Sequence, residues 1–165
     1  MGGEIQMENI GNFLEEKILP VAAKLASNQY LIAIRDGITM SMPLIIIGSL
    51  FMVIASFPAP GWEEWLGSIG VSGYLWKGVD SSFGLVGLVS AFGIAYSLSD
   101  QNKVDGLSAG IISLSSFILV TPFVSGEEGA GIAVGLIGAR GLFVAIILGI
   151  LSAKIYQWFI DRSEE

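Results

Sequence analysis

Residues 37–62 read GITMSMPLIIIGSLFMVIASFPAPGW and carry no charged side chain. A helix rises about 1.5 Å per residue, so about 20 apolar residues cross a hydrocarbon core about 30 Å thick. Residues 81–99 and 106–126 are also free of charge, and residues 129–153 contain only Arg140. A soluble chain of 165 residues could not enclose four helices that are apolar on all sides. The sequence therefore predicts an all-α, polytopic helical membrane protein with about four transmembrane helices.

The apolar stretches and the polar segments between them set the expected boundaries. Glu63, Glu64 and Lys77 mark residues 62–77 as a solvated loop whose aromatic side chains suit the membrane interface. The glycine-rich residues 123–138 are expected to form a flexible outer loop or a re-entrant piece. The expected transmembrane domain is 33–165, with spans at about 33–57, 82–98, 106–122 and 139–159.

Residues 1–32 are expected to form an amphipathic segment before the first span. Apolar side chains recur at helical spacing on one face, which suits a helix lying at the membrane interface. Pro20 predicts a kink or two short helices. The alternative is an amphipathic helix packed on a soluble partner. The apolar positions are Ile10, Phe13, Leu14, Ile18, Val21 and Leu25.

Composition excludes several classes of function. The formal net charge of −7 argues against binding to nucleic acid, which selects basic surfaces. The chain has no cysteine and no histidine, so it offers no thiolate and no imidazole for catalysis or metal binding. We therefore predict no catalytic residue, no metal ligand and no cofactor. Glu127 and Glu128 are interpreted as a solvated loop pair and not as an acid/base dyad.

The distribution of basic residues predicts how the chain is oriented in the membrane. With the N-terminus in the cytoplasm, six basic residues lie inside and two lie outside, as the positive-inside rule requires. We interpret Arg35 as an anchor of this kind and Asp36 as its neighbour at a helix start, where an anion suits the dipole. The alternative is that this pair contacts a transport domain. The inside residues are Lys17, Lys24, Arg35, Lys103, Lys154 and Arg162, and the outside residues are Lys77 and Arg140.

Three expected spans carry small residues at four-residue spacing. Such stripes let helix backbones approach closely in lipid, where hydrophobic contrast contributes little to association. We interpret them as helix-packing or dimer-interface positions, and the sequence leaves open whether they pack within or between chains. The stripes are Gly87, Ala91, Ala95 and Ser99 in the second span, Gly106 and Gly110 in the third, and Gly141, Ala145, Gly149 and Ala153 in the fourth.

Several ordered motifs resemble one transporter family. They are FLEEKILP at 13–20, AIRDG at 33–37, MPLIIIGSLF at 42–51, DQNKVDG at 100–106 and GARGLFVAII at 138–147. Together they resemble the start of the IIC permease component of the bacterial phosphoenolpyruvate-dependent phosphotransferase system, in its lactose/cellobiose/chitobiose branch. The likeness covers essentially all of this chain but only roughly the first third of a family member.

The resemblance implies a disaccharide permease of the bacterial inner membrane that works with separate IIB and IIA phosphotransferase proteins. It also implies a homodimer in contact with membrane lipid, with this chain supplying the scaffold and dimer interface. The family's sugar-binding residues lie in the C-terminal half, so no substrate-binding residue is assigned here. The alternative function is a small membrane interaction or regulatory protein that pairs with full-length permeases.

Overall fold

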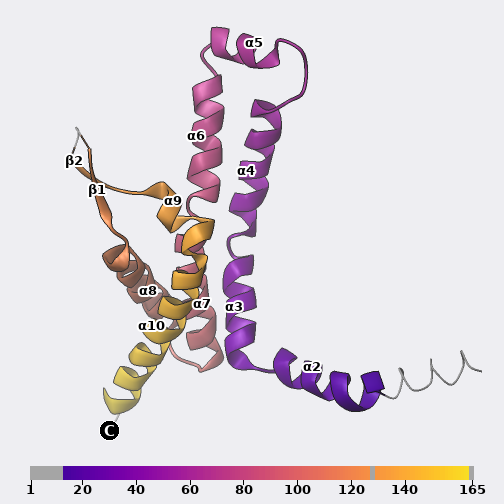
Figure 1. The fold of residues 1–165 in the computed structure, drawn as a ribbon. Helices are drawn as coiled ribbons and strands as arrows, with labels where there is room; N and C mark the ends of the chain where they lie inside the picture. The colour runs from indigo at the N-terminus through magenta and orange to yellow at the C-terminus, as the bar shows by residue number, and fades with distance from the viewer. Residues whose placement is uncertain (1–12, 127–128, 164–165) are drawn as a thin grey trace, which may run out of the picture.

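The computed structural model describes residues 13–126 and 129–163, and Figure 1 shows how its helices are arranged. Ile10 and the pair Glu127–Glu128 lie outside the described residues. The described chain is mostly helical. Within it, three helical segments are long and apolar enough to cross a membrane, and a fourth apolar helix is shorter. The all-α polytopic architecture expected from the sequence is therefore confirmed.

The N-terminal amphipathic segment is helical and stands away from the other helices (Figure 1). A π-helix, η1 (Leu14–Ile18), runs directly into α2 (Leu19–Ala26), and no residue of either is buried. Pro20 lies in the first turn of α2, where its missing N–H is tolerated. Asn28 then caps the next helix by accepting hydrogen bonds from the N–H groups of Tyr30 (2.9 Å) and Leu31 (3.4 Å).

The first long segment is interrupted near its middle. It consists of α3 (Gln29–Thr39) and α4 (Met42–Ala55), which together extend over 27 residues. The Ser41 hydroxyl donates to the Ile38 carbonyl at 2.6 Å, beside the break. The sequence predicted one uninterrupted span at 33–57. The helix instead begins earlier, because Asn28 supplies the cap, and it breaks just before Pro43, which has no N–H to continue the ladder.

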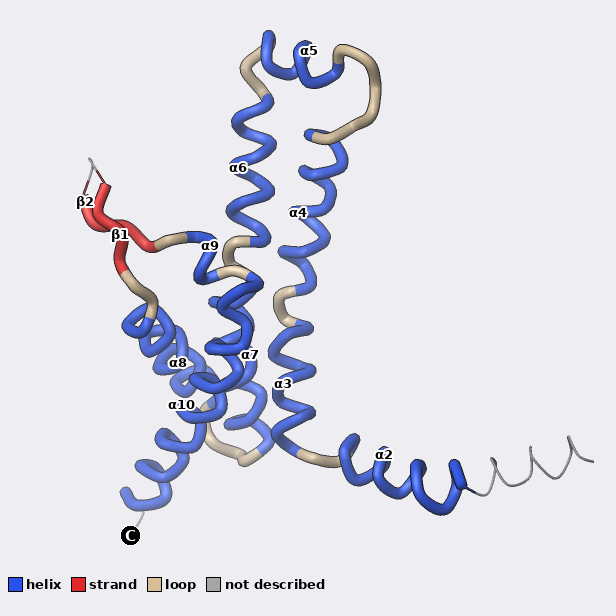
Figure 2. The backbone as a smooth tube through the Cα atoms, viewed as in Figure 1, coloured by secondary structure: helices blue, strands red, loops and turns tan. Residues whose placement is uncertain are grey.

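The second long segment corrects the loop expected at 62–77. That region forms α5 (Trp62–Ser68) and α6 (Ser72–Phe83), and α6 continues into α7 (Val86–Gln101). Ser72–Gln101 is 30 residues long, much longer than the span expected at 82–98. The helical hairpin of α4 and α6 is closed by α5 (Figure 2). It forms because Gly48 admits the ring of Phe83 and Gly78 admits that of Phe51.

A shorter apolar helix lies where the third span is expected, and the segment after it differs from the expectation. α8 (Gly106–Val120) follows a short turn in which Lys103 takes a positive φ of 59°. The expected outer loop at 123–138 is instead an antiparallel hairpin, β1 (Phe123–Gly126) with β2 (Gly129–Ile132), followed by α9 (Val134–Ile137). Phe123 pairs with Ile132. The chain ends with a single 3-10 turn, η2 (Ala139–Gly141), and α10 (Leu142–Ser163).

Helix α7 is the centre of the packed region. α3, α8 and α10 all pack against it, and most of its residues are buried. One cluster joins the small side chains of Ala33, Ala95, Ala109 and Ala153 around Leu98. A second cluster, towards the hairpin, is built on Phe117 and Ile137. The division into a segment 1–32 and a transmembrane domain 33–165 stays a prediction.

Candidate functional site in the helix-packing core

The contact between α7 and α10 depends on a missing side chain. A Cβ built on Gly149 would lie 2.9 Å from the Cβ of Ile94 and 3.2 Å from the carbonyl oxygen of Ala91. Ala145 and Ala153, one helical turn away on either side, are also buried. The part of the ladder within α10, Ala145, Gly149 and Ala153, therefore faces α7 of the same chain, and close backbone approach needs a residue without a β-carbon at position 149.

The ladder of α7 is covered in the same way. A Cβ on Gly87 would lie 2.5 Å from the carbonyl oxygen of Gly138. Ala91, Ala95 and Ser99 continue this stripe and are fully or almost fully buried. A Cβ on Gly141 would collide with the carbonyl oxygen of Leu136. At Gly87 and Gly141 the neighbouring atoms are backbone carbonyl oxygens, which have little freedom to move aside.

The pair in α8 packs on aromatic rings of α7. A Cβ on Gly106 would lie 2.8 Å from the carbonyl oxygen of Tyr96, and one on Gly110 would lie 2.6 Å from the ring of Phe92. Phe92 and Tyr96 stack on each other with ring centroids 6.1 Å apart. The two glycines thus make room for a stacked aromatic pair between α7 and α8.

All nine small residues singled out from the sequence are buried by helices or turns of the same chain. Their use as a dimer interface stays a prediction, because the single chain contains no second copy to test it. The small side chains themselves have little surface left for a partner. The nine are Gly87, Ala91, Ala95, Gly106, Gly110, Gly141, Ala145, Gly149 and Ala153.

Sequence reasoning missed two glycines at the contact between α3 and α7. A Cβ on Gly93 would lie 2.8 Å from the carbonyl oxygen of Gly37, and one on Gly37 would collide with the backbone and side chain of Ile94. Gly37 lies four residues from Ala33 and from Ser41, and Gly93 lies four residues before Ser97, so small residues at four-residue spacing mark both glycines. A search for small residues at this spacing would therefore have found the positions, but only the structure shows that α3 and α7 pack on each other there.

Three buried hydroxyls connect helices inside the core. Ser90 donates to the Ser41 hydroxyl at 3.4 Å, beside the break between α3 and α4. Ser113 donates to the carbonyl oxygen of Ala91 at 2.8 Å and so joins α8 to α7. In lipid, where water does not compete, such bonds between helices contribute about 0.6 kcal/mol each on average. These bonds could not be predicted from sequence, because serine occurs throughout the spans.

The outer surfaces of the spans are apolar and uncovered. On α4, the side chains of Ile46, Leu50 and Val53 are each about 60% exposed. Among the described elements, α6 is the one that packs extensively on α4. On α10, Phe143 and Ile147 are likewise exposed. These faces are suited to contact with lipid or with another apolar helix.

The charged groups form no arrangement suited to catalysis within the described residues. Arg35 and Asp36 make an ion pair at 2.8 Å, with Arg35 largely exposed. Asp36 lies late in α3, so its expected place at a helix start was wrong. The helix begins at Gln29, seven residues earlier, because Asn28 provides the cap. Across residues 13–126 and 129–163, no group of three acidic, histidine or cysteine side chains could hold a metal ion.

One carboxylate outside the spans has a shifted pKa. Asp105 caps α8 by accepting hydrogen bonds from the N–H groups of Leu107 (3.1 Å) and Ser108 (3.3 Å). The Ser108 hydroxyl also donates to this carboxylate. That hydroxyl bond, opposed by slight desolvation and helped by the two N–H groups, holds the pKa of Asp105 below its ordinary value. The effect belongs to helix capping and not to a reactive site.

The fold and the packed core define a helical membrane protein whose spans are held together by small residues. Residues 35–163 match the family model of the phosphotransferase system, EIIC. The chain belongs to this EIIC family. It therefore belongs to the family of sugar-transporting permease components that the ordered motifs resemble.

The chain is similar to two curated permease components. It is 43% identical to the lichenan permease IIC component of Bacillus subtilis (strain 168), over 95% of this chain and 38% of that protein. It is 44% identical to the cellobiose-specific EIIC component of Geobacillus stearothermophilus, again over 95% and 38%. The chain thus spans little more than a third of the length of these relatives.

A solved structure has the same fold. The crystal structure of the transporter ChbC, the IIC component of an N,N'-diacetylchitobiose-specific phosphotransferase system, matches with a TM-score of 0.82 and 38% sequence identity. The match covers 92% of this chain and 38% of that one. The covered share is consistent with an N-terminal portion of a permease, as the order of the motifs predicted.

Proposed function

We propose that this chain is the membrane scaffold portion of a phosphotransferase-system permease for a disaccharide of the cellobiose, chitobiose or lactose type. The observation that carries the proposal is the packing of α3, α8 and α10 around α7 through small residues. This packing makes a rigid unit in the membrane, and the described residues bring together no catalytic constellation. The likeness to ChbC and to the cellobiose-specific relative supports the substrate class.

The partners follow from the same proposal. The complete permease would bind the disaccharide and work with IIB and IIA phosphotransferase proteins. We place the sugar-binding residues in the part of the permease that this chain does not span. The chain itself is expected to bind no cellobiose or diacetylchitobiose.

We also propose that the chain forms a homodimer through the uncovered face of α4. This face is apolar, and only 17% of an 18-residue apolar stretch within Gln29–Ala55 is buried within the chain. Ile46, Leu50 and Val53 repeat at helical spacing along it. Membrane lipid covers the remaining apolar faces, including that of α8.

We further propose that the protein lies in the bacterial inner membrane with both termini in the cytoplasm. The six-to-two division of basic residues supports this orientation. In the structure, Lys154 of α10 lies over the ring of Tyr30 of α3, at 5.4 Å from its centroid. Two segments far apart in sequence therefore bring a basic and an aromatic side chain to the same membrane level, as suits the cytoplasmic interface.

A chimera tests the scaffold function. The matching portion of the cellobiose-specific relative is replaced by this chain, and phosphotransferase-dependent uptake of cellobiose is measured in cells lacking their own permease. We expect uptake of cellobiose, because the scaffold would come from this chain and the sugar site from the relative. A chimera that inserts at normal levels and forms dimers but takes up no cellobiose would contradict the proposal.

A further inference from the structure

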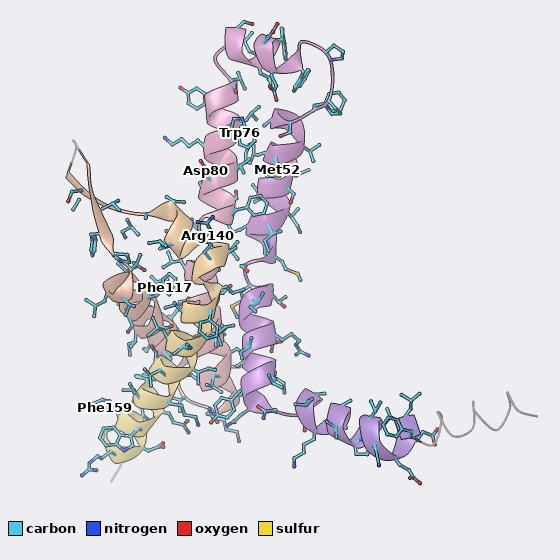
Figure 3. The ribbon with its side chains drawn as sticks, in the orientation of Figure 1. Met52, Trp76, Asp80, Phe117, Arg140 and Phe159 are labelled. Carbon is cyan, nitrogen blue, oxygen red and sulfur yellow. The ribbon has the colours of Figure 1, made fainter. Side chains whose placement is uncertain are left out.

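A crevice of ≈ 460 Å³ opens between the end of α6 and the segment formed by α9 and η2. One carboxylate, that of Asp80, and one guanidinium, that of Arg140, line it. The rest of the lining is apolar or backbone. In Figure 3 the labelled Arg140 lies just beneath α6, the helix that carries Asp80. The other lining residues are Phe83, Gly84, Val134, Gly135, Gly138 and Ala139.

The floor of the crevice is formed by close contacts at two glycines. A Cβ on Gly138 would lie 2.7 Å from the carbonyl oxygen of Phe83, and one on Gly84 would collide with Val134. The α6–α7 junction and the α9–η2 segment are therefore in close contact, through the Gly138 backbone at one point and the Val134 side chain at another. Such a contact leaves little room for sliding, so the two charged side chains are held on opposite walls of a fixed opening.

The crevice lies near one boundary of the membrane. The cluster containing Ala33, Leu98 and Ala153 packs against Tyr30, and Lys154 lies over the Tyr30 ring. This cluster therefore marks the level of the opposite membrane boundary, where basic residues are found. Counted along the helices at about 1.5 Å per residue, Arg140 is about 20 Å and Asp80 about 27 Å from that level. A hydrocarbon core is about 30 Å thick, so both charges lie near the start of the opposite headgroup region.

The two charges face the crevice without joining. Among the described residues, the ion pair within 4.0 Å is that of Arg35 with Asp36. Asp80 and Arg140 are therefore further apart than a direct contact, and both are exposed. Charged side chains near the membrane core pair with each other, with backbone or with polar groups of a ligand. An opening that holds opposite charges apart is complementary to a group that itself carries both charges.

We propose that this crevice binds the headgroup of a zwitterionic phospholipid of the phosphatidylethanolamine type. The Arg140 guanidinium donates to the phosphate oxygens, which its planar fork suits. The Asp80 carboxylate accepts from the ammonium group. Phe83 and Val134 contact the glycerol region, and the acyl chains continue along the uncovered apolar surface. The lipid thereby connects the α4–α6 hairpin to the α9–η2 segment.

Thermal unfolding of the full chain in detergent tests the site, with palmitoyl-oleoyl phosphatidylethanolamine and phosphatidylglycerol as probes. Native mass spectrometry counts the lipids that stay bound. We expect phosphatidylethanolamine to raise the Tm of the parent and phosphatidylglycerol, which has no ammonium group, to raise it less. Arg140→Gln and Asp80→Asn should each weaken binding of phosphatidylethanolamine by about tenfold, an interaction loss of about 1.4 kcal/mol. Arg162→Gln and Asp161→Asn are the matched controls and should keep the full effect.

Three results would overturn the proposal. Equal shifts with the two lipids would mean that the crevice does not read the ammonium group. Retention of the phosphatidylethanolamine shift in both site variants would place the lipid elsewhere. The exchanged variant Asp80→Arg/Arg140→Asp separates a direct ion pair from a lipid site. If it restores in lipid-free detergent a Tm that either single change lowers, the two residues pair with each other and need no lipid.

Discussion

Gly149 of α10 lies so close to Ile94 of α7 that a β-carbon at position 149 would come within 2.9 Å of the Ile94 Cβ. Both residues are buried, and the Ala91 carbonyl oxygen of α7 would also lie 3.2 Å from that β-carbon. Neither neighbour is the far end of a flexible side chain. The contact between the two helices is therefore limited by backbone approach, and the size of residue 149 sets how closely α7 and α10 pack.

Gly149→Ala is expected to destabilise the chain by about 1–3 kcal/mol, the usual cost of overpacking a well-packed interior. The measurement is the Tm in detergent. Gly73→Ala is the matched control, because Gly73 lies in helix α6 and a β-carbon there would meet nothing within 4 Å. That change should leave the Tm the same or slightly higher, since alanine favours a helix over glycine. Equal effects of the two changes would mean that α7 and α10 do not pack as described.

The cap of α8 should respond to pH in a defined direction. The pKa of Asp105 is lowered in the folded chain, chiefly by the hydroxyl of Ser108. A depressed carboxyl pKa adds stability that is complete above the unfolded value of about 3.9 and is lost as pH falls through the folded value. Asp105→Ala should therefore lower the Tm at neutral pH, and the difference from the parent should shrink in acid.

Asp105→Asn separates the cap from its charge. Asparagine also accepts hydrogen bonds from the first N–H groups of a helix but does not titrate. Its Tm difference from the parent should come only from the lost charge and should vanish in acid, while Asp105→Ala keeps a residual deficit. A deficit of Asp105→Ala that does not change with pH would exclude a contribution from the ionised carboxylate.

The long apolar stretches could be located from sequence because hydrophobic length alone decides whether a helix can span the membrane. The α6 helix could not, because Lys77 and Asp80 break the apolar pattern and resemble loop residues. Its helical state depends on packing against α4, where Gly78 receives the ring of Phe51. That contact is tertiary and leaves no periodic signal in α6 itself.

Neither the β-hairpin nor the partner of each small-residue stripe could be predicted from the sequence, for different reasons. The strand that begins at Gly129 contains glycine and alanine in place of alternating polar and apolar residues, so no period of two is visible. The stripe ending at Ala153 could be found at once, but its partner could not. Small residues indicate that another backbone comes close, but they do not indicate whether that backbone belongs to the same chain.

Reporter fusions test the orientation of the spans. Fusions after Lys103 and at the C-terminus should report the cytoplasm, and one after Trp65 in α5 should report the outside. The reason is the excess of basic residues on the side of Lys103. An external signal after Lys103 would contradict both the orientation and the path of α7. An external signal from all three fusions would indicate that the chain does not cross the membrane as described.

The position of α2 can be measured with single nitroxide labels, because the chain has no native cysteine. Val21 and Ala23 lie about 200° apart around the helix. If α2 lies in the membrane interface, a label on Val21→Cys should be the more accessible to oxygen, which concentrates in lipid. A label on Ala23→Cys should be the more accessible to a water-soluble nickel complex. Equal accessibility to the nickel complex would favour the alternative of a helix that packs on a soluble partner.

The proposed dimer face of α4 predicts a specific cross-link. Leu50 is 60% exposed on this face and Leu119 of α8 is 82% exposed on a face that we assign to lipid. In a symmetric dimer the same patch of both copies meets, so identical positions near the axis come together. Leu50→Cys should form disulfide-linked dimers in membranes under mild oxidation, and Leu119→Cys should form few. Ala95→Cys, at a fully buried position of α7, should form none. Cross-linking at Leu119 without Leu50 would move the interface to α8. Strong cross-linking at Ala95 would show that the small-residue stripe opens to a second copy, and the packing of α7 within one chain would then not describe the dimer.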